Sequence, residues 1–389
     1  MSPRQTVNIG VAAHIYAAAS GGPRGAGGLS ATERSEPENG IWCCFKHGKA
    51  IDSDGGRIYS AADLQAWKRL HEARKAAEVN GAPLHNIGLV ESISVNSAPV
   101  ASLEGRTFDL AMRNVFIGPS ASGKSVLTRL IASVSYPDHV ADMSRCRDVD
   151  MAVRWFDPHT HDVITTGRRG QVTHVLDGRP VPYVARPYKT ILLNGMHRNC
   201  VGNIVKLAHT FDLSVSAMKG TLSLLCSQSN FVRAVHYEDT RVRWVLDING
   251  RILDVVDIQW LGNHLQSSIL LEVAGIHAQL HAHVEPTFLL IDELLDFYRH
   301  PPSAQVDVLD RLQRAAEHAQ VAIVGHSIGL VEAASSGWTV TAMEYHPSTI
   351  SGGQIDFEVA IEEPNAEKQL SNRHGHYAQS VEPPGQPPT

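Results

Sequence analysis

The sequence contains no apolar run of about 18 residues, the length that a helix needs to cross a bilayer. Its first residues, 1–6, lack the charged and then apolar pattern of a secretion signal, so we expect a cytoplasmic protein without a membrane partner. Five cysteines in 389 residues do not indicate a disulfide framework. The net charge of −6 provides no general attraction to nucleic acid, so any such binding requires a local site.

One octapeptide matches the phosphate-binding pattern G-x-x-x-x-G-K-[ST] in full. Its residues are Gly118, Pro119, Ser120, Ala121, Ser122, Gly123, Lys124 and Ser125. The apolar segment 114–117 predicts a buried strand before it, and the apolar spacing in 126–131 predicts a helix after it. Such a turn points several backbone N–H groups and a helix N-terminus at one place, which suits a triphosphate. We expect ATP here, with Lys124 at the β- and γ-phosphates and the Ser125 hydroxyl on Mg²⁺.

Two later segments have the form of buried strands that end in polar residues. Residues 288–291 are followed by Asp292 and Glu293, and residues 321–325 are followed by His326. Beside a phosphate loop, Asp292 would hold Mg²⁺ and Glu293 would orient or deprotonate the attacking water. His326 would contact the γ-phosphate and sense its loss, although a histidine that only satisfies a turn explains the same pattern.

The order of these three segments resembles the ABC-type ATPases, in particular the soluble branch that includes SMC-type heads and the overcoming-lysogenization-defect nucleases. This resemblance implies that Gly118–Ser125 is the Walker A loop, Asp292 the Walker B carboxylate, Glu293 the catalytic glutamate and His326 the switch histidine. It also implies a homo-oligomer that forms through the ATPase heads.

The serine-glycine signature of that family has no good match in the sequence. Residues 261–268 occupy the corresponding place before the Walker B segment and match it poorly. Ser351–Gln354 reads Ser-Gly-Gly-Gln but lies after the switch histidine, so we expect it to form a hairpin turn. Nucleotide binding is therefore predicted more firmly than dimer-dependent hydrolysis.

The N-terminal segment contains His14, Asn39 and His47 in an order that resembles the HNH endonucleases, which have a ββα-metal fold. The match includes the loop 21–24 and the pair 67–68 on a following helix, and it resembles a bacterial subgroup found beside ATPases in anti-phage systems. The resemblance implies that His14 is the general base, that Asn39 orients it and braces the hairpin, and that His47 binds catalytic Mg²⁺ or Mn²⁺.

This chemistry explains why such residue types are needed. A divalent ion neutralises the phosphodiester, and a neutral histidine, which titrates near neutrality, takes a proton from water. We expect Arg24 and Lys46 to contact phosphates of the cleaved strand.

The N-terminal segment also departs from the HNH pattern. Ala13 stands where many relatives have a second metal ligand, and Asp52 or Asp54 would have to replace it. A structural zinc ion is left open, because Cys44 and His47 supply only half of a tetrahedral site.

The rest of the sequence predicts the helices and strands that surround these motifs. A helix begins after Ser60, has Asp63 in its first turn and ends near Asn80-Gly81. Residues 200–285 are expected to be mainly helical with one strand pair that turns at 249–250, and residues 303–319 are expected to form a helix. His277 and His281 share a helix face, which we expect to be a polar face and not a metal site, because no third ligand is evident.

We therefore predict an α/β protein, with a small ββα-metal HNH domain (1–82), an ABC-type P-loop head with a mixed sheet and a helical subdomain (83–362), and a disordered tail (363–389). The expected function is that of an ATP-regulated, metal-dependent DNA endonuclease of anti-phage defence, with DNA and a second defence subunit as candidate partners. One alternative is an ATPase whose degenerate HNH module only binds DNA or a partner effector. Another is a P-loop that holds nucleotide as a structural or sensory ligand.

Overall fold

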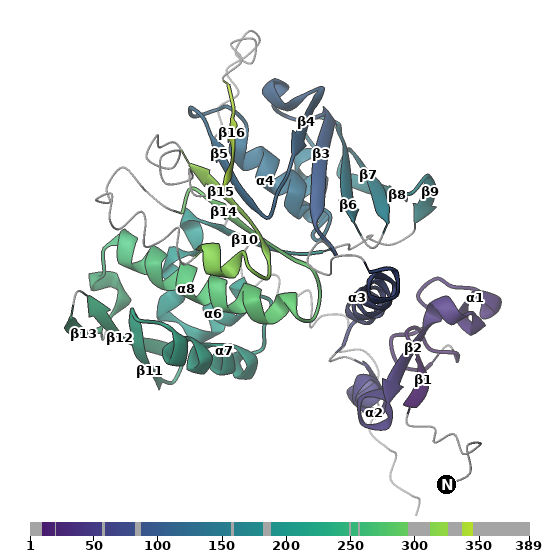
Figure 1. The fold of residues 1–389 in the computed structure, drawn as a ribbon, viewed down its shortest axis with the longest axis horizontal. Coiled ribbons are helices and arrows are strands. Elements are labelled where there is room, and N and C mark those ends of the chain that lie inside the picture. The colour runs from purple at the N-terminus through teal and green to yellow at the C-terminus, as the bar shows by residue number, and fades with distance from the viewer. Residues whose placement is uncertain are drawn as a thin grey trace, which may run out of the picture. The chain divides into compact units, whose positions relative to one another are not determined.

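The protein has a mixed α/β fold in a computed structural model (Figure 1). The structure describes residues 10–19, 21–56, 59–81, 87–156, 159–181, 188–248, 250–255, 257–294, 312–325 and 337–344. The predicted turn at 351–354, the tail at 363–389 and the boundary at 82–83 lie outside these residues.

The N-terminal segment forms a ββα unit with additional helices. Its elements are β1 (Gly10–His14), α1 (Ala31–Ser35), η1 (Pro37–Asn39), β2 (Gly40–Cys44), α2 (Phe45–Asp52), η2 (Ser53–Gly56) and α3 (Ala61–Asn80). Strands β1 and β2 pair antiparallel, and α2 packs against both of them. The contact is close, because a Cβ atom added at Gly48 of α2 would lie 2.4 Å from a methyl carbon of Val11. A small apolar core that includes Ile15, Ile41 and Leu64 holds the unit together.

Helix α3 begins and ends where the sequence predicts. The Ser60 hydroxyl accepts from the Asp63 N–H, and the Asp63 carboxylate accepts from the Ser60 N–H, so that a capping box satisfies the first turn. Gly81 closes the helix with a left-handed backbone at φ 66°. These signals are local, and for that reason they can be recognised in the sequence.

A five-stranded parallel sheet positions the nucleotide motifs. Its strands are β5 (Arg113–Ile117), β10 (Lys189–Asn194), β14 (Thr287–Asp292), β15 (Gln320–Gly325) and β16 (Thr339–Ala342). They lie in the order β10-β14-β15-β5-β16, and every pair is parallel. All six residues of β14 and all six of β15 are buried, as expected for inner strands covered on both faces. The predicted strands before Asp292 and before Gly325 are therefore confirmed.

Helix α4 (Lys124–Ala132) and a second sheet cover one face of the parallel sheet (Figure 1). The second sheet is antiparallel, in the order β4-β3-β6-β7-β8-β9. The elements of this layer are β3 (Val90–Ser97), η4 (Ala101–Leu103), β4 (Arg106–Asp109), α5 (Asp138–Met143), β6 (Val149–Phe156), β7 (Thr160–Arg168), β8 (Gln171–Leu176) and β9 (Arg179–Val181). One continuous core joins Leu127 and Ile131 of α4 to Ile93 of β3 and Leu290 of β14.

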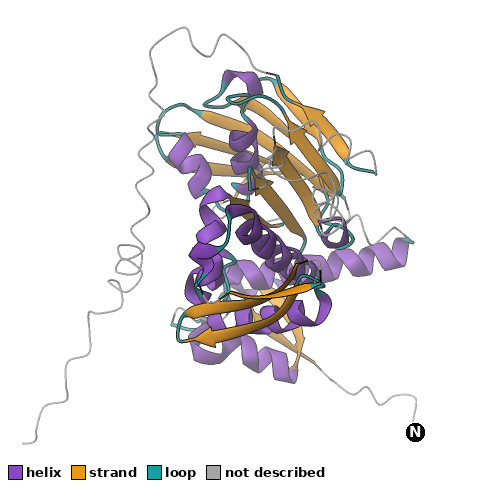
Figure 2. Ribbon diagram, turned by 90° about the vertical axis from the view of Figure 1, so that its left-hand side faces the viewer, coloured by secondary structure: helices purple, strands orange, loops and turns teal. Residues whose placement is uncertain are grey.

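Helices and a three-stranded sheet cover the opposite face, where Leu289 and Ile291 of β14 point into another core. Its elements are η5 (Gly195–Gly202), α6 (Ile204–Thr210), α7 (Val215–Gln228), β11 (Val232–Glu238), β12 (Arg241–Ile248), β13 (Arg251–Val255), η6 (Ile258–Trp260) and α8 (Asn263–Ala282). Figure 2 shows the three strands in orange against purple helices, and β11 packs on α7.

The structure confirms one expectation for this region and corrects another. The predicted strand pair is β12 and β13, and β11, which was not predicted, adds a third strand. The predicted polar face of α8 is wrong at His277, which is only 3% exposed and packs edge-on against Phe211. Residues 312–315 are helical, whereas the rest of the predicted helix before residue 312 lies outside the described part of the chain.

Candidate functional site

The phosphate loop connects β5 to α4 in a conformation that depends on small residues. Ala121 and Gly123 have positive φ angles of 63° and 91°, and Gly123 is the N-cap residue of α4. Gly118 lies against β16, where an added Cβ atom would be only 2.3 Å from the Met343 carbonyl oxygen. A side chain at position 118 would therefore displace either the loop or the end of β16.

Lys124 is folded over the loop. Its ammonium nitrogen donates to the carbonyl oxygens of Gly118 at 2.8 Å and Pro119 at 2.7 Å, and the residue is 3% exposed. Burial lowers the pKa of Lys124, while the negative charges of Glu293 and Asp292 oppose that shift. The loop thus already holds the cationic group through two carbonyl oxygens.

Ser125 and Asp292 meet although they follow different strands. The Ser125 hydroxyl donates to the Asp292 carboxylate at 3.0 Å, and Asp292 is 8% exposed. Burial raises the pKa of Asp292, and the neighbouring Glu293 adds to that effect, while the hydrogen bond from Ser125 lowers it. A hydroxyl and a carboxylate oxygen side by side are the donor types that Mg²⁺ prefers, so these residues fit a magnesium ion.

Of the two other predicted residues of this site, Glu293 belongs to the described part of the chain and His326 does not. Glu293 follows β14 directly, is exposed and has a positive φ of 50°. Its charge raises the pKa of Lys124. His326 lies outside the described residues, immediately after the end of β15 at Gly325.

Two residues near the loop were not predicted from the sequence. Asn194 ends β10 and is in register with Asp292, and its side-chain oxygen accepts from the Met196 N–H at 3.0 Å. The signal was available, because a polar residue directly follows an apolar strand. Ser102 donates to the Ser122 carbonyl oxygen at 3.0 Å from the short helix η4, and no local pattern announces that contact.

Asn39 ties together the loop that separates β1 from β2. It is 4% exposed, its side-chain oxygen accepts from the Tyr16 N–H, and its amide group donates to the carbonyl oxygens of Tyr16 and Arg34. All three bonds are 2.8 to 2.9 Å long. These bonds join the residues after β1 to the end of α1, so Asn39 has the position of a brace.

Arg24 is part of the internal framework and does not face a phosphate. Its guanidinium donates to the carbonyl oxygens of Ile15, Ile51 and His14 and to the Asp52 carboxylate, at 2.6 to 3.1 Å. The side chain is only 6% exposed. The expectation of a phosphate contact by Arg24 is therefore wrong, because the same fork of donors already joins the end of β1 to the end of α2.

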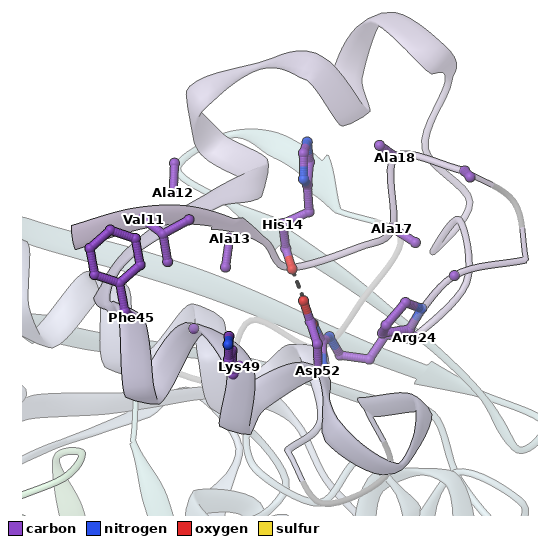
Figure 3. Close-up of a pocket in the computed structure, with 14 residues that line it drawn as sticks. Val11, Ala12, Ala13, His14, Ala17, Ala18, Arg24, Phe45, Lys49 and Asp52 are labelled. Carbon is purple, nitrogen blue, oxygen red and sulfur yellow. Dashed lines mark hydrogen bonds and ion pairs between the residues drawn. The ribbon is translucent and has the colours of Figure 1, made fainter. Parts of the chain in front are cut away.

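A cavity of about 420 Å³ lies between β1, α2 and the loop that carries Arg24. Figure 3 shows Lys49, Asp52 and Arg24 around it, while the imidazole of His14 points away from Lys49 and Asp52. His14 itself is exposed and is paired with Gly40 across the hairpin. The polar groups of the cavity and the imidazole of His14 thus lie on different sides of β1.

His47 is exposed in the first turn of α2, and its Nδ1 atom lies 3.2 Å from the Cys44 sulfur. Within the described part of the chain, no three His, Cys, Asp or Glu side chains come close enough to hold a metal ion. Asp52 is bound to Arg24, and the side chain of Asp54 lies outside the described residues. Cys44 and His47 are thus the two candidate ligands that the described residues bring together here.

Comparisons with known proteins concern only the coarse fold. No known family model matches the sequence. No curated protein matches it either. The chain is similar to an Smc head bound to the C-winged helix domain of ScpA, with 10% identity and a TM-score of 0.46 over 63% of this chain and 92% of that one. It is also similar to an Smc head with an extended coiled coil, bound to the C-terminal domain of ScpA, from Pyrococcus furiosus. That match has 9% identity and a TM-score of 0.41 over 63% of this chain and 91% of the other.

None of the helices in the described residues is both long enough and apolar enough to pass through a membrane.

Proposed function

We propose that this chain is a magnesium-dependent nucleoside triphosphatase with ATP as its substrate. The observation that carries the proposal is the hydrogen bond of 3.0 Å between Ser125 and Asp292 beside the buried Lys124. Strand β15 lies between the strands that precede these residues, so the site exists only in the folded sheet. All of its groups lie at the carboxyl ends of parallel strands, where α/β proteins bind ligands.

The roles of the residues follow from their positions. The loop N–H groups and the N-terminus of α4 would bind the phosphates, and the Lys124 ammonium would exchange its carbonyl acceptors for the more strongly accepting phosphate oxygens. Ser125 and Asp292 would hold a magnesium ion, which neutralises phosphate charge when bound. Glu293 would orient or deprotonate the attacking water. His326 would contact the γ-phosphate.

Binding of a fluorescent ATP analogue in the presence of Mg²⁺ tests the proposal. Lys124→Ala and Asp292→Asn are each expected to weaken binding by at least about tenfold, because each removes a charge-assisted contact to phosphate or metal. Lys206→Ala is the matched control, since Lys206 is exposed on α6. Equal affinity of the wild-type chain and Lys124→Ala would refute the assignment. Binding without release of inorganic phosphate would limit the site to a structural or sensory ligand.

We propose that the N-terminal module binds DNA or a partner effector under the control of the nucleotide state. Support comes from the exposed side chains of Lys46, His47 and Lys49 on α2. Association of the heads into a homo-oligomer would bring two such modules together. A second defence subunit is a candidate partner, and defence against phage is the setting that the sequence resemblance implies.

A metal-dependent endonuclease is the second candidate function of this module. Its support is the ββα order of β1, β2 and α2, with Asn39 bracing the intervening loop beside His14. Plasmid DNA incubated with Mg²⁺ or Mn²⁺ separates the two functions. Cleavage that is lost in His14→Ala would support the endonuclease, whereas DNA retention in a gel-shift assay with EDTA, without cleavage when metal is added, would support binding alone.

A further inference from the structure

The backbone at Glu293 has a conformation that needs external support. Glu293 is a non-glycine residue with φ at 50°, in the left-handed region that L-residues adopt only at a cost in free energy. This conformation sets the direction in which the carboxylate leaves the end of β14. One hydrogen bond that holds this backbone comes from the Glu293 N–H, which donates to the Val324 carbonyl oxygen of β15 at 3.3 Å.

Arg198 also holds the backbone at Glu293. One nitrogen of its guanidinium, Nη2, donates to the carbonyl oxygens of Glu293 at 3.3 Å and Leu294 at 2.9 Å. Its Nε atom donates to the Ser267 hydroxyl at 2.9 Å, and that hydroxyl donates to the same Leu294 carbonyl at 3.0 Å. Arg198, Ser267 and Leu294 therefore form a closed hydrogen-bonded set, which we call the Arg198 clip.

The clip joins three segments that are distant in the sequence. Arg198 belongs to η5, which follows β10 directly, and the last residue of β10 is in register with Asp292. Ser267 lies in α8 and is 1% exposed, so its hydroxyl has a fixed place in the core. A planar guanidinium with donors in a rigid fork fits this arrangement, whereas a lysine ammonium cannot serve the same acceptors from one point.

We propose that Arg198 is a positioning residue for ATP hydrolysis, which holds the backbone of Glu293 and Leu294 so that the Glu293 carboxylate faces Lys124 and the attacking water. This inference rests on the proposed ATPase function. Within the described part of the chain, the hydrogen bonds of Arg198 go to Ser267, Glu293 and Leu294, and none of these residues belongs to the phosphate loop. Loss of the clip should therefore reduce turnover and leave nucleotide affinity nearly unchanged.

The test measures ATP turnover and binding of a fluorescent ATP analogue on the full chain. Arg198→Ala should lower kcat by about tenfold or more while Kd changes by less than about twofold, because ground-state binding is retained. Ser267→Ala should lower kcat less, since Arg198 keeps its bonds to Glu293 and Leu294. Arg198→Lys should restore thermal stability but not turnover. Arg233→Ala is the matched control, because Arg233 pairs only with Asp247 at the surface among the described ion pairs.

A double-mutant cycle with Glu293→Gln separates positioning from general damage. If Arg198 acts through the Glu293 carboxylate, adding Arg198→Ala to Glu293→Gln should lower the residual turnover by less than about twofold. A full additional loss in that background would overturn the inference, and so would an equal loss in kcat and affinity. If the wild-type chain turns over ATP and Arg198→Ala does so equally fast, the inference alone fails. Lack of turnover in the wild-type chain would refute the proposed hydrolysis and the inference together.

Discussion

Buried His277 makes the stability of this protein depend on pH in a window that can be calculated. Its ring lies in α8 with centroids 5.3 Å from Phe211 and 5.5 Å from His281, and its Nε2 atom has no hydrogen-bond partner among the described residues. Burial lowers the pKa of His277 from 6.5 to about 4, the positive charge of Lys189 adds to the shift, and Asp212 opposes it. His277 is therefore neutral in the folded protein at neutral pH.

The unfolded chain binds this proton more readily than the folded protein between the two pKa values. The contribution of neutral His277 to the free energy of unfolding is fully present above about pH 6.5 and is lost as the pH falls towards 4. The lowered pKa corresponds to about 3 kcal/mol in total, because one pKa unit is worth 1.36 kcal/mol. At pH 5 the loss amounts to about 2 kcal/mol.

His277→Phe removes the titrating group and keeps an aromatic ring against Phe211. Urea unfolding of the wild-type chain and of this variant at pH 8 and pH 5 measures the effect. We expect the variant to gain about 2 kcal/mol relative to wild type on going from pH 8 to pH 5. The control His209→Phe, at an exposed position of α6, should leave the pH dependence unchanged. Parallel pH dependences of wild type and His277→Phe would refute the reasoning.

Four further predictions concern the phosphate loop, helix α7 and the N-terminal module. Gly118→Ala should weaken ATP-analogue binding by about tenfold or more, because the added Cβ atom would lie 2.3 Å from the Met343 carbonyl oxygen. Gly220→Ala lies in open space on α7 and should raise the free energy of unfolding, measured with urea, by about 0.5–1 kcal/mol. Asn39→Ala should destabilise the ββα unit by about 2–4 kcal/mol, since the buried Asn39 side chain makes three hydrogen bonds that are lost, and unchanged hydrogen-exchange protection of β1 would contradict this. Arg24→Lys should expose β1 and α2 to limited proteolysis, because one ammonium cannot reach three carbonyls and a carboxylate; resistance equal to wild type would show that the fork is dispensable.

The parts of the fold that the sequence predicted correctly are those encoded in short windows. The capping box at Ser60 and Asp63, the left-handed Gly81 and the apolar strand before Asp292 each depend on neighbouring residues. Strand β11 was missed because its side chains alternate poorly between buried and exposed, so the period of two that marks a strand is weak there. Antiparallel hydrogen bonding to β12 makes this segment a strand, although its own sequence pattern does not predict one.

Arg24 and His277 show why side-chain roles could not be read from the sequence. A positive charge next to glycines suggests a phosphate contact, yet the carbonyl oxygens of Ile15 and Ile51 occupy the guanidinium of Arg24. Two histidines four residues apart in a helix suggest a polar face, yet His277 is buried and packs against Phe211. In both cases the decisive partners come from distant segments, and the residue type alone is compatible with either environment.

The sequence by itself determined that a phosphate loop with Lys124 and Ser125 lies between a strand and a helix, because that geometry depends on one contiguous stretch and its glycines. Only the tertiary structure decided that Asp292 reaches Ser125, because β15 is inserted between their strands and sets their separation. It also decided that Arg198 reaches the backbone of Glu293, since hydrogen bonds between distant segments form only where the packed core places them.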